Sequence, residues 1–591
     1  MQTTHTVISL IARELQLAEP QVAATVRLLE DGATVPFISR YRKEATGSLD
    51  EVGIAEIKLR LAKYTELAAR KESILGTIGE QGQLTPELRR KIEECWDKTQ
   101  LEDIYLPYKP KRKTRAEAAR QAGLEPLARQ IMAQAPIQLQ QAAARYVQGQ
   151  VPDAAAALQG ARDIIAEWVN ENVRARNLVR SCFDRYARIT AKVVKGKEEE
   201  AANFRNYFDW DCSLQRVASH QYLAVRRGEE AGFLRVDIAP DAERTTERLM
   251  PLFVRGAGDC SRQVAMAVED SYKRLLKPSI ESEVASAAKE KADAEAIRVF
   301  ADNARQLLMG APLGAKRILG LDPGFRSGCK LVCIDESGRL LHNENIYPHP
   351  PQSQVAQASA TLAHLVEAYK IEAIAIGNGT ASRETEQFVQ RIRFPRQVKV
   401  FVVSEDGASV YSASKVARDE FPEYDVTVRG AVSIARRLAD PLAELVKIDP
   451  KSIGVGQYQH DVDQKRLGES LTATVESVVN RVGVDLNTAS SHLLTYVSGL
   501  GPALAQSIVD YRGAHGRFAN RKALLEVPKL GAKTYQQAAG FLRVSGSDNP
   551  LDATAVHPES YAVVERMAKD LKVTVADLIR DKRLRQQIDL P

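Results

Sequence analysis

Apolar residues three or four positions apart recur through the first part of the chain. Ile54, Ile57 and Leu61 form one such series, and this spacing places side chains on one face of a helix. Strand-like sequence is brief there and clearest at 232–238. The pattern predicts a helical scaffold over residues 1–315, with a helix-turn-helix-like pair at its start.

The pattern changes at Lys316, where short apolar stretches separated by turns replace the helical spacing. Strands are predicted at 317–321, 328–334, 340–347, 371–376 and 398–403, with a helix on either side of the fourth. Three strands in hairpin order followed by alternating helices and strands predict a mixed sheet covered on both faces. This order is typical of a ribonuclease-H-like domain, as in RuvC-like Holliday-junction resolvases, and we assign it to 316–456. The predicted fold class is multidomain and mainly α, with this one α/β domain.

Two short segments interrupt the helical sequence that resumes at 457. They are Gly499, Leu500 and Gly501 in the first copy and Lys529, Leu530 and Gly531 in the second. Glycines permit a tight turn and the close approach of a phosphodiester, and the leucine fills the gap between the flanking helices. The first amides of each following helix lack intrahelical acceptors, so free N–H groups and the helix dipole attract a phosphate. Two copies about thirty residues apart predict a tandem helix-hairpin-helix domain over 457–545, although Lys529 replaces the first glycine of the second copy.

Basic side chains gather around these segments, although the net charge of +6 from 82 basic and 76 acidic residues is small for 591 residues. The predicted contributors are Arg517, Arg521, Lys522, Lys529 and Lys533. Contacts with phosphates fix the register of a nucleic acid without reading its sequence. The sequence therefore predicts binding to the RNA or DNA backbone that is independent of base sequence and weakens as salt rises.

Composition excludes several other classes of protein. No stretch approaches the ~18 apolar residues of a membrane helix, and no basic region precedes the apolar patch at 7–12. Neither a membrane partner nor a leader peptide is predicted, and we expect a cytoplasmic protein. The six cysteines include no C-x-x-C pair, which argues against a zinc site or a disulfide framework. Cys329 and Cys333 share one face of a strand, where buried free thiols are expected.

Carboxylates decide whether the ribonuclease-H-like domain can be a nuclease. A two-metal nuclease of this fold gathers several acids at the sheet edge. The candidates are Asp322 after the first strand, Glu405 or Asp406 after the fifth, and Asp440 in a late helix. The acid expected after 371–376 is missing, because that place holds Asn378, a poor ligand for a cation. We therefore predict a degenerate, non-catalytic domain without a cofactor, in which Asp322 is structural or holds a single metal ion.

Six strings of the sequence resemble those of the Tex family of bacterial transcription accessory proteins. They lie at 32–47, 101–112, 207–210, 319–324, 454–461 and 555–561. The resemblance covers nearly the whole chain and implies a relative of the core of a eukaryotic transcription elongation factor that also chaperones histones. It implies binding of RNA and DNA without strong sequence preference, near transcribing RNA polymerase. It also implies that the ribonuclease-H-like domain, called YqgF-like in this family, is degenerate.

The same resemblance implies a C-terminal OB-fold barrel that binds single-stranded RNA through a basic groove and stacking aromatic residues. No five-strand pattern follows Arg543, and residues 546–591 are predicted to be a helical segment. The barrel is therefore not expected within this sequence, and we expect modest, salt-sensitive binding.

The string at 32–47 leaves two interpretations open. Arg40, Arg42 and Lys43 could form a functional basic loop. Alternatively the segment braces neighbouring helices, with its arginines paired to acids of the scaffold, and we favour this interpretation.

The leading hypothesis is a non-catalytic nucleic-acid-binding factor of transcription. One alternative is a structure-selective nuclease of the resolvase type, which would use Asp322, Glu405 and Asp440 with Mg²⁺ or Mn²⁺. The other alternative makes residues 1–315 a docking platform for RNA polymerase or ribosomal components. Cleavage of branched nucleic acid that depends on Asp322 would support the nuclease, and recovery of a specific protein by residues 1–315 would support docking.

Overall fold

The computed structural model of the chain describes residues 2–110, 114–454 and 456–588. The last two residues of the 101–112 string, and Val455 of the 454–461 string, lie outside the described residues.

Two compact units make up the chain. Unit 1 contains the first seven residues and Leu59–Ala296, and unit 2 contains Ile8–Lys58 and the chain from Ile297 onward. The predicted scaffold of 1–315 is therefore divided between the units, because residues 8–58 pack with the C-terminal half of the chain.

Unit 1 is mainly helical and carries one small sheet. Its helices are α6 (Pro86–Glu94), α7 (Lys98–Tyr105), α8 (Arg115–Gln121), α9 (Glu125–Ala133), α10 (Leu139–Ala144), α11 (Ala154–Glu171), α12 (Val173–Tyr186), α13 (Ser219–Glu230), α14 (Ala242–Phe253) and α15 (Asp259–Ser271), with the adjoining parts of α5 (Glu51–Glu80) and α16 (Lys277–Leu308). Its antiparallel strands, in the order β2-β1-β3, are β1 (Arg188–Val193), β2 (Asp209–Ser213) and β3 (Leu234–Ala239). β3 coincides with the strand predicted at 232–238, whereas the hydrophobic pattern did not reveal β1 and β2. In β2, Asp209 and Asp211 flank Trp210, so the apolar alternation that marks a strand is missing.

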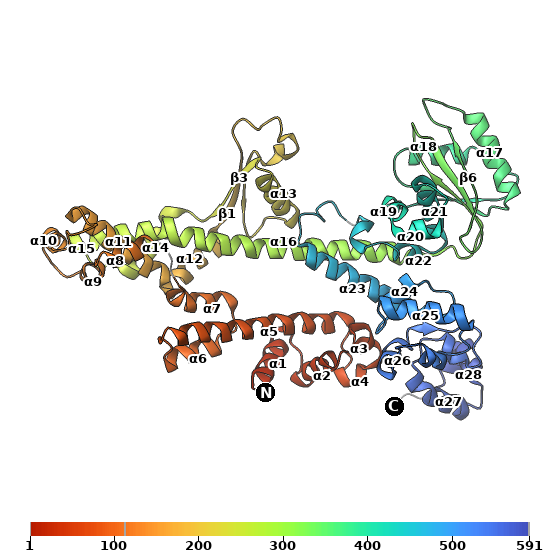
Figure 1. Cartoon of the computed structure of the whole chain (residues 1–591), viewed down its shortest axis with the longest axis horizontal. Coiled ribbons are helices and arrows are strands. Elements are labelled where there is room, and N and C mark those ends of the chain that lie inside the picture. The colour runs from red at the N-terminus through yellow and green to blue at the C-terminus, as the bar shows by residue number, and fades with distance from the viewer. Residues whose placement is uncertain (1, 111–113, 455, 589–591) are drawn as a thin grey trace. The chain divides into compact units, whose positions relative to one another are not determined.

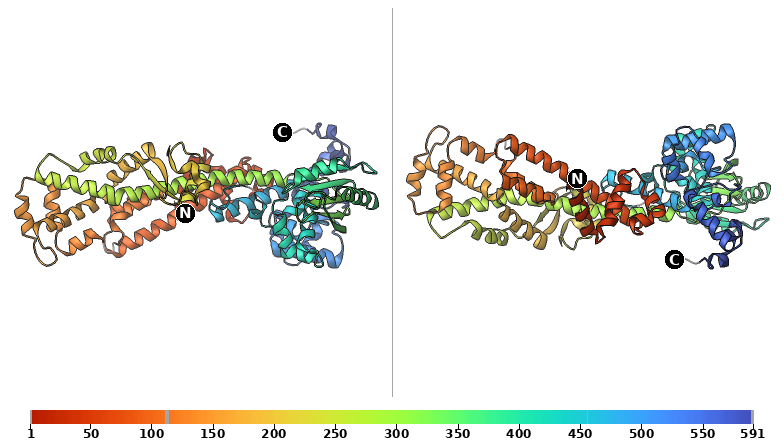
Figure 2. Two further views of the ribbon diagram at one scale, coloured as in Figure 1. Left: turned by 90° about the horizontal axis from the view of Figure 1, so that it is seen from above. Right: turned by 90° about the horizontal axis from the view of Figure 1, so that it is seen from below.

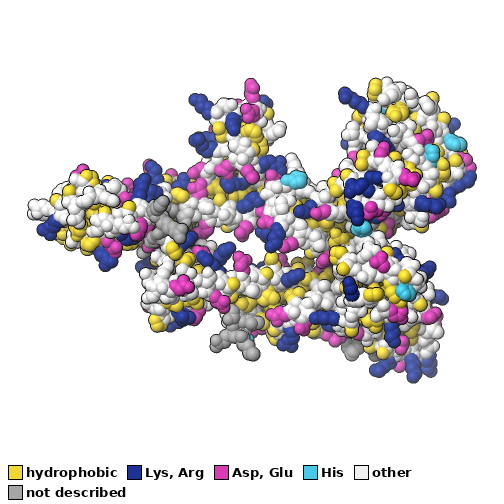
Figure 3. Space-filling model, viewed as in Figure 1, with side chains coloured by type: hydrophobic (Ala, Val, Ile, Leu, Met, Phe, Trp, Pro, Cys, Tyr) yellow, Lys and Arg dark blue, Asp and Glu magenta, His cyan; other side chains and the backbone are white. Residues whose placement is uncertain are grey.

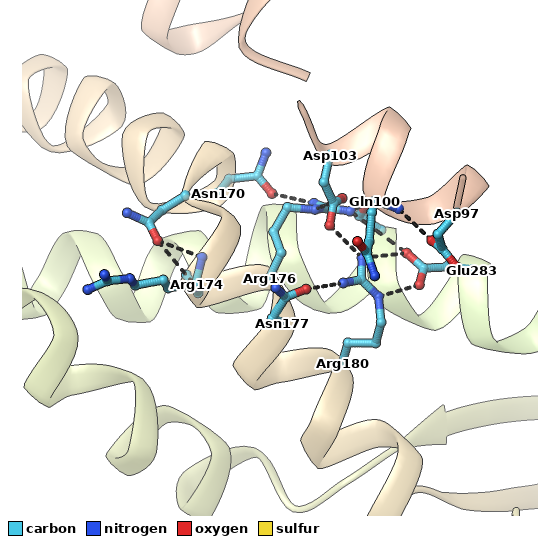
Figure 4. Close-up of polar contacts among 12 residues, drawn as sticks. Asp97, Gln100, Asp103, Asn170, Arg174, Arg176, Asn177, Arg180 and Glu283 are labelled. Carbon is cyan, nitrogen blue, oxygen red and sulfur yellow. Dashed lines mark hydrogen bonds and ion pairs between the residues drawn. The ribbon is translucent and has the colours of Figure 1, made fainter. Parts of the chain in front are cut away.

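A buried group of ion pairs joins three helices of unit 1 around Asp103 of α7 (Figure 4). Arg176 of α12 donates to Asp103 Oδ1 across 2.5 Å, and Arg180 of the same helix donates to Oδ2 across 2.9 Å. Arg180 also pairs with Glu283 of α16 across 2.5 Å. Asp103 is only 3% exposed, so removal of its partners would leave a buried charge, at a cost of ~3–5 kcal/mol. Asp103, which belongs to the 101–112 string, thus has a structural role within unit 1.

The ribonuclease-H-like sheet lies in unit 2, where Figures 1 and 2 show it in green from three sides. Its strands are β4 (Ile318–Asp322), β5 (Cys329–Ile334), β6 (Leu340–Ile346), β7 (Ala373–Gly377) and β8 (Lys399–Val403), in the spatial order β6-β5-β4-β7-β8. β4 pairs antiparallel with β5 and parallel with β7, which in turn pairs parallel with β8. The sheet is mixed, as predicted, and the carboxyl ends of β4, β7 and β8 meet at one edge.

Helices cover both faces of this sheet, which confirms the prediction. Leu319 and Leu321 pack in a core with α17 (Val355–Ala368) and α18 (Ser382–Gln390). Ile318, on the opposite face, packs with α21 (Val426–Ala439). α21 comes so close to β4 that a Cβ at Gly320 would lie 2.8 Å from the Ala431 carbonyl oxygen.

The two cysteines of β5 lie in the core between the sheet and α17. Cys329 and Cys333 are buried free thiols, as their spacing on one strand face predicts. Burial raises the pKa of the Cys333 thiol to about 12. Both side chains therefore act as packing residues.

The other helices of unit 2 come from both ends of the chain. They are part of α1 (Gln2–Leu15), then α2 (Glu19–Glu30), α3 (Val35–Tyr41), α4 (Lys43–Thr46), α19 (Ala408–Ala413), α20 (Lys415–Glu420), α22 (Pro441–Leu445), α23 (Gln464–Val482), α24 (Ser491–Thr495), α25 (Pro502–His515), α26 (Ala532–Ala538), α27 (Tyr561–Asp570), α28 (Val575–Arg580) and α29 (Lys582–Arg585). α25 and α26 begin directly after the two glycine segments, as predicted. Beyond Arg543 the described residues form helices and loops. None of the helices described here combines the length and the apolar character that a membrane span requires.

Candidate nucleic-acid interface

The first glycine segment forms a tight turn between α24 and α25. Gly499 has a φ of +79°, and a Cβ at this position would lie 2.8 Å from the Cβ of Gln537, so only glycine fits. Leu500 is 9% exposed and fills the space between the helices, as predicted. Gly501 has extended backbone, and a Cβ built on it would meet no atom within 4 Å. The turn is thus closed on the side of Gly499 and open on the side of Gly501.

The second segment repeats this geometry thirty positions later. Equivalent backbone hydrogen bonds close both turns. In the first turn the Leu500 N–H donates to the Val497 oxygen (2.9 Å) and the Ala505 N–H to the Gly501 oxygen (2.9 Å). In the second turn the Leu530 N–H donates to the Val527 oxygen (3.1 Å) and the Tyr535 N–H to the Gly531 oxygen (2.9 Å). Lys529 takes the place of Gly499 and adopts a φ of +67°. This conformation costs an L residue roughly 1–2 kcal/mol. The hairpin geometry therefore imposes a left-handed backbone even where glycine is absent.

Both helices that follow the turns begin without a side-chain cap. Gly501 and Gly531 are the N-cap residues of α25 and α26, and neither can supply a side-chain acceptor. Within the described chain no backbone acceptor is assigned to the N–H groups of Ala503, Leu504, Lys533 and Thr534. A Cβ at Gly531, as at Gly501, would project into open space. Each helix start therefore offers free donors and the positive end of a helix dipole to an anion.

Four of the five predicted basic side chains are exposed. They are Arg517, Lys522, Lys529 and Lys533, and the described residues contain no ion pair to any of them. Lys529 lies in the second turn and Lys533 in the first turn of α26. Arg517 and Lys522 follow the end of α25, about 20 Å along this 14-residue helix from the first turn. On the face drawn in Figure 3, cations are interspersed with acidic side chains. The positions of individual basic residues therefore matter more for binding an anion than the overall electrostatic field of the surface.

Arg521 corrects the prediction of a surface cation. Its side chain is 1% exposed, although it was expected to add charge for a phosphate. The guanidinium donates to the backbone oxygens of Leu542, Thr554 and Val556 and to the Tyr561 hydroxyl. A guanidinium surrounded by acceptors cannot reach a phosphate unless this region unfolds. Arg521 therefore holds the segment 542–561 on the hairpin module.

The 32–47 string packs directly on the first turn. Gln537 of α26 donates to the Gly32 carbonyl oxygen across 3.0 Å and accepts from the Thr34 N–H across 3.2 Å. The Thr34 hydroxyl forms a hydrogen bond with Ser498, which immediately precedes Gly499. Because Gln537 is also the side chain against which Gly499 packs, this contact positions the turn.

The arginines of the string support the brace interpretation. Arg42 Nη1 pairs with Glu559 Oε2 across 3.0 Å, and Arg40 Nη1 donates to the Asn480 carbonyl oxygen across 3.3 Å. The acid therefore lies near the C-terminus rather than in the predicted scaffold. Lys43 is exposed.

Two of the three candidate carboxylates lie together at the sheet edge. Asp322 ends β4, and Glu405 follows β8 with its carboxylate so close to Gly379 that a Cβ there would collide with it. Burial raises the pKa of Asp322, although Lys330 opposes the shift. Burial and then the charge of Asp322 raise the pKa of Glu405. The pair is thus partly desolvated and mutually repulsive.

These residues do not fit a two-metal site. The Oδ1 atom of Asn378, at the place of the expected acid, accepts the Glu405 N–H across 3.0 Å and ties the ends of β7 and β8 together. Lys330 lies opposite Asp322 in the β4–β5 register and brings a positive charge to it. Among the described residues, no three His, Cys, Asp or Glu side chains are grouped so that they could hold a metal ion. Divalent ions need several oxygen ligands, and this edge supplies two carboxylates.

Asp440 does not belong to this site. Gly430 of α21 lies against Asp322, since a Cβ there would be 4.0 Å from Asp322 Oδ2. Asp440 follows the last residue of the same helix, about 15 Å further along its axis. Its Oδ1 atom accepts the Ala443 N–H across 3.0 Å and caps α22. The prediction that Asp440 is the late helical acid of this site was therefore wrong, because Asp440 lies at the other end of α21 from Asp322.

Sequence reasoning missed the residues that support the turns. Gln537 and Ser498 are buried polar side chains, and no pattern around them distinguishes them from ordinary helix and turn residues. Thr34 lies in a string that the family resemblance had singled out, so a signal existed there but its partner could not be named. Side-chain contacts between segments 464 and 503 residues apart become visible only in the folded chain.

Comparison with known families gives matches along most of the chain. In chain order, the matching family models describe a Tex-like protein N-terminal domain (5–79), a Tex central region (134–300), a Tex protein YqgF-like domain (316–439), a helix-hairpin-helix motif (479–543) and an HHH domain (549–591). These matches agree with the predicted fold class, and the third coincides with the mixed sheet described above.

Whole proteins from bacteria and animals are also similar to this chain. Protein tex of Bordetella pertussis is 48% identical over 97% of this chain and 75% of its own length. Transcriptional accessory protein Tex of Neisseria gonorrhoeae is 47% identical over 98% of this chain and 78% of its own length. S1 RNA-binding domain-containing protein 1 of Homo sapiens is 32% identical over 95% of this chain and 63% of its own length.

Proposed function

Since the chain belongs to the Tex family, we propose that it is a non-catalytic transcription accessory factor that binds nucleic acid through its tandem hairpins. The observation that carries this proposal is the pair of turns with the same hydrogen bonds, each followed by an uncapped helix start that opens to solvent. The names of the relatives, a transcriptional accessory protein and a protein with an RNA-binding domain, point in the same direction.

In this proposal the amides after Gly501 and Gly531 bind two phosphates of one backbone. Lys529 and Lys533 add positive charge at the second turn, where their side chains are exposed. Backbone amides recognise the phosphate and not the base, so binding is independent of sequence. Each cation that neutralises a phosphate releases a counterion, so the affinity falls as salt rises.

The partners in this proposal are RNA and DNA near RNA polymerase or the ribosome in the cytoplasm. Direct docking of polymerase or ribosomal components on the helices of the first half stays a prediction. The function needs no cofactor, because the free N–H groups of a folded helix supply the binding energy.

The test compares a blunt double-stranded oligonucleotide bound by the full chain and by two single variants, Gly501→Glu and Gly531→Glu. Both substitutions fit the backbone and meet open space, so each places a carboxylate beside the phosphate without disturbing the fold. We expect each to weaken binding at least about ten-fold, because juxtaposed like charges cost several kcal/mol. Gly513→Glu is the matched control, since it adds the same charge to α25 where a Cβ also meets no neighbour. Equal affinities for all four proteins would show that the turns do not bind the backbone.

The nuclease alternative receives less support from the sheet edge. Asn378 holds the Glu405 backbone instead of a cation, and Lys330 adds positive charge beside Asp322. We therefore expect no cleavage of branched DNA or RNA in the presence of Mn²⁺ or Mg²⁺. Cleavage by the wild type that disappears in Asp322→Asn would replace the proposal with a nuclease.

A further inference from the structure

A second concave surface of the hairpin module lies at the opposite end of α25 from the first turn. It is formed between the end of α25 and the short 3₁₀ helix Arg521–Glu526, and its volume is ≈ 550 Å³. Sites for small organic ligands usually have volumes of about 300–1,000 Å³. The residues of this pocket all belong to unit 2, and neither the hairpin amides nor the sheet-edge carboxylates line it.

A stack of three aromatic rings forms one wall of the pocket. The rings of Phe518 and Tyr511 are 5.4 Å apart and inclined by 23°, and those of Tyr511 and His515 are 4.2 Å apart and inclined by 17°. Phe518 is 4% exposed, whereas His515 at the other end is exposed. The stack therefore begins in the core and ends at an open imidazole face, on which a further planar ring can be placed.

The wall is held in place by the backbone around it. Asn487 binds both sides of the Phe518 peptide, donating to its carbonyl oxygen across 3.1 Å and accepting from its N–H across 2.8 Å. The Tyr511 hydroxyl donates to Glu526 across 2.7 Å, which links α25 to the 3₁₀ helix. A pre-formed pocket of this kind loses little conformational entropy when a ligand binds.

Two exposed cations complete the pocket. Arg517 and Lys522 both line it, and neither has an ion-pair partner among the residues that the structure describes. A planar stacking surface next to two free cations matches a ligand that is planar at one end and anionic at the other, which is the chemistry of a nucleotide. Inside a paired duplex both faces of each base are covered by neighbours, so an unpaired base is the part of a nucleic acid strand that can extend the stack.

We infer that this pocket binds an unpaired nucleotide of RNA or DNA, with its base stacked on His515 and its phosphate held by Arg517 and Lys522. The inference rests on the proposed function, because the hairpins would bring the strand to the module. The pocket lies about 20 Å from the first turn, the length of α25. A single strand that leaves a duplex at the first turn therefore needs several nucleotides to reach it.

The experiment measures the affinity of the full chain for three oligonucleotides. One is a blunt duplex, the second is the same duplex with single-stranded overhangs of eight nucleotides at either end, and the third has abasic overhangs. The wild type is expected to bind the normal overhang duplex about ten-fold more tightly than the blunt one, which is within the range measured for stacking of one base on an aromatic side chain. The abasic overhang should give little of this gain.

Variants at the outer ring separate stacking from charge. His515→Ala should remove the ten-fold gain and leave the affinity for the blunt duplex unchanged, whereas His515→Phe should keep the gain because it retains a stacking ring. His515 is exposed at the end of α25, so both variants preserve the core. The inference is overturned if His515→Ala keeps the gain, if His515→Phe loses it, or if the abasic overhang binds as tightly as the normal one.

Gly501→Glu distinguishes failure of this inference from failure of the proposed function. If the hairpins bind the duplex, Gly501→Glu weakens the blunt duplex and leaves the ratio between overhang and blunt ligands unchanged. If neither Gly501→Glu nor Gly531→Glu has an effect on the blunt duplex, the proposed function fails, whatever happens at His515.

Discussion

The two candidate sites of unit 2 are built from different parts of the chain. At the hairpins the donors are backbone amides. Gly501 and Gly531 leave these amides uncapped because glycine has no side chain. At the edge of the ribonuclease-H-like sheet everything depends on ionisable side chains, and among the described residues Asp322 and Glu405 are not part of a group of three that could hold a metal ion. A backbone site follows from the turn geometry, whereas a carboxylate site needs the correct residue at each of several positions.

The tolerance of the two sites to replacement differs for the same reason. Lys529 occupies the place of a glycine, yet the second turn keeps the hydrogen bonds of the first. Asn378 occupies the place of an acid, and the sheet edge is left with two repelling carboxylates beside Lys330. One replacement in the hairpin leaves the donors in place, and one replacement at the sheet edge removes a ligand. Four predictions, from the largest expected effect to the smallest, test this contrast.

The largest effect is expected at Arg521, because the hairpin module depends on its burial. Arg521→Ala leaves the backbone oxygens of Leu542, Thr554 and Val556 without their donor, and should lower the free energy of unfolding of the module by about 4 kcal/mol, because each buried acceptor left unpaired costs ~1–3 kcal/mol. Hydrogen exchange of the 532–544 amides in increasing urea measures this change. Arg517→Ala, at an exposed position, should change it by less than about 0.5 kcal/mol. Similar values for the two variants would contradict the structural role of Arg521.

The ribonuclease-H-like domain should also depend on the ion pairs that Glu420 makes with Arg436 and Lys447. Burial opposes ionisation of Glu420, but Lys447, the Tyr411 hydroxyl and Arg436 outweigh it and lower the pKa of Glu420 to about 2. Because the pKa is lowered on folding, the stabilisation is complete above the unfolded value of about 4.3 and is lost as the pH falls toward 2.

Glu420→Gln should therefore lower the free energy of unfolding by about 2 kcal/mol at pH 7 and flatten its decline between pH 4.5 and 2. Denaturant titrations of wild type and variant across this pH range make the comparison. Glu423→Gln, at an exposed position three residues away, is the control and should follow the wild type. An unchanged acid decline in Glu420→Gln would rule out this carboxylate as its source.

At the second turn, replacing Lys529 by glycine should stabilise the fold and weaken binding of nucleic acid. Lys529→Gly removes a left-handed L residue and should stabilise the module by about 1 kcal/mol. It also removes a cation, so the slope of log affinity against log salt should become shallower by about 0.9. Lys529→Arg is the matched control, which keeps both the charge and the strain. A salt slope that is the same in all three proteins would place Lys529 outside the interface.

The smallest effect is expected at the sheet edge. Burial and the charge of Asp322 raise the pKa of Glu405, so its ionisation costs stability as the pH rises above the unfolded value of about 4.3. Glu405→Gln should increase the free energy of unfolding at pH 7, by less than about 1 kcal/mol because solvent screens this half-buried group. Denaturant midpoints at pH 4 and pH 7 measure the change. Asp440→Asn should have no such pH effect, since asparagine also caps a helix and Asp440 lies elsewhere. A loss of stability in Glu405→Gln at pH 7 would contradict the repulsion.

Sequence reasoning succeeded where a local pattern determines a local structure. The five strands between 318 and 403, both glycine turns and the helices after them all lie where the spacing of apolar residues and glycines predicts. It failed where the outcome depends on distant neighbours. The local sequence predicts a surface cation at Arg521, but in the folded chain acceptors of 542–561 surround its guanidinium. The local sequence predicts a catalytic acid at Asp440, but α21 runs so that Gly430, and not Asp440, lies against Asp322.

By itself, the sequence determined the order of elements, the mixed sheet and the two phosphate-sized turns, because hydrophobic periodicity and glycine act over a few residues. Only the tertiary structure decided which polar residues serve a site and which serve the fold. It placed Gln537 between Gly32 and Gly499, buried Arg521, and aligned Phe518, Tyr511 and His515 in one stack. The physical reason is that burial and hydrogen-bond partners depend on contacts between segments far apart in the chain, for which the local sequence carries no signal.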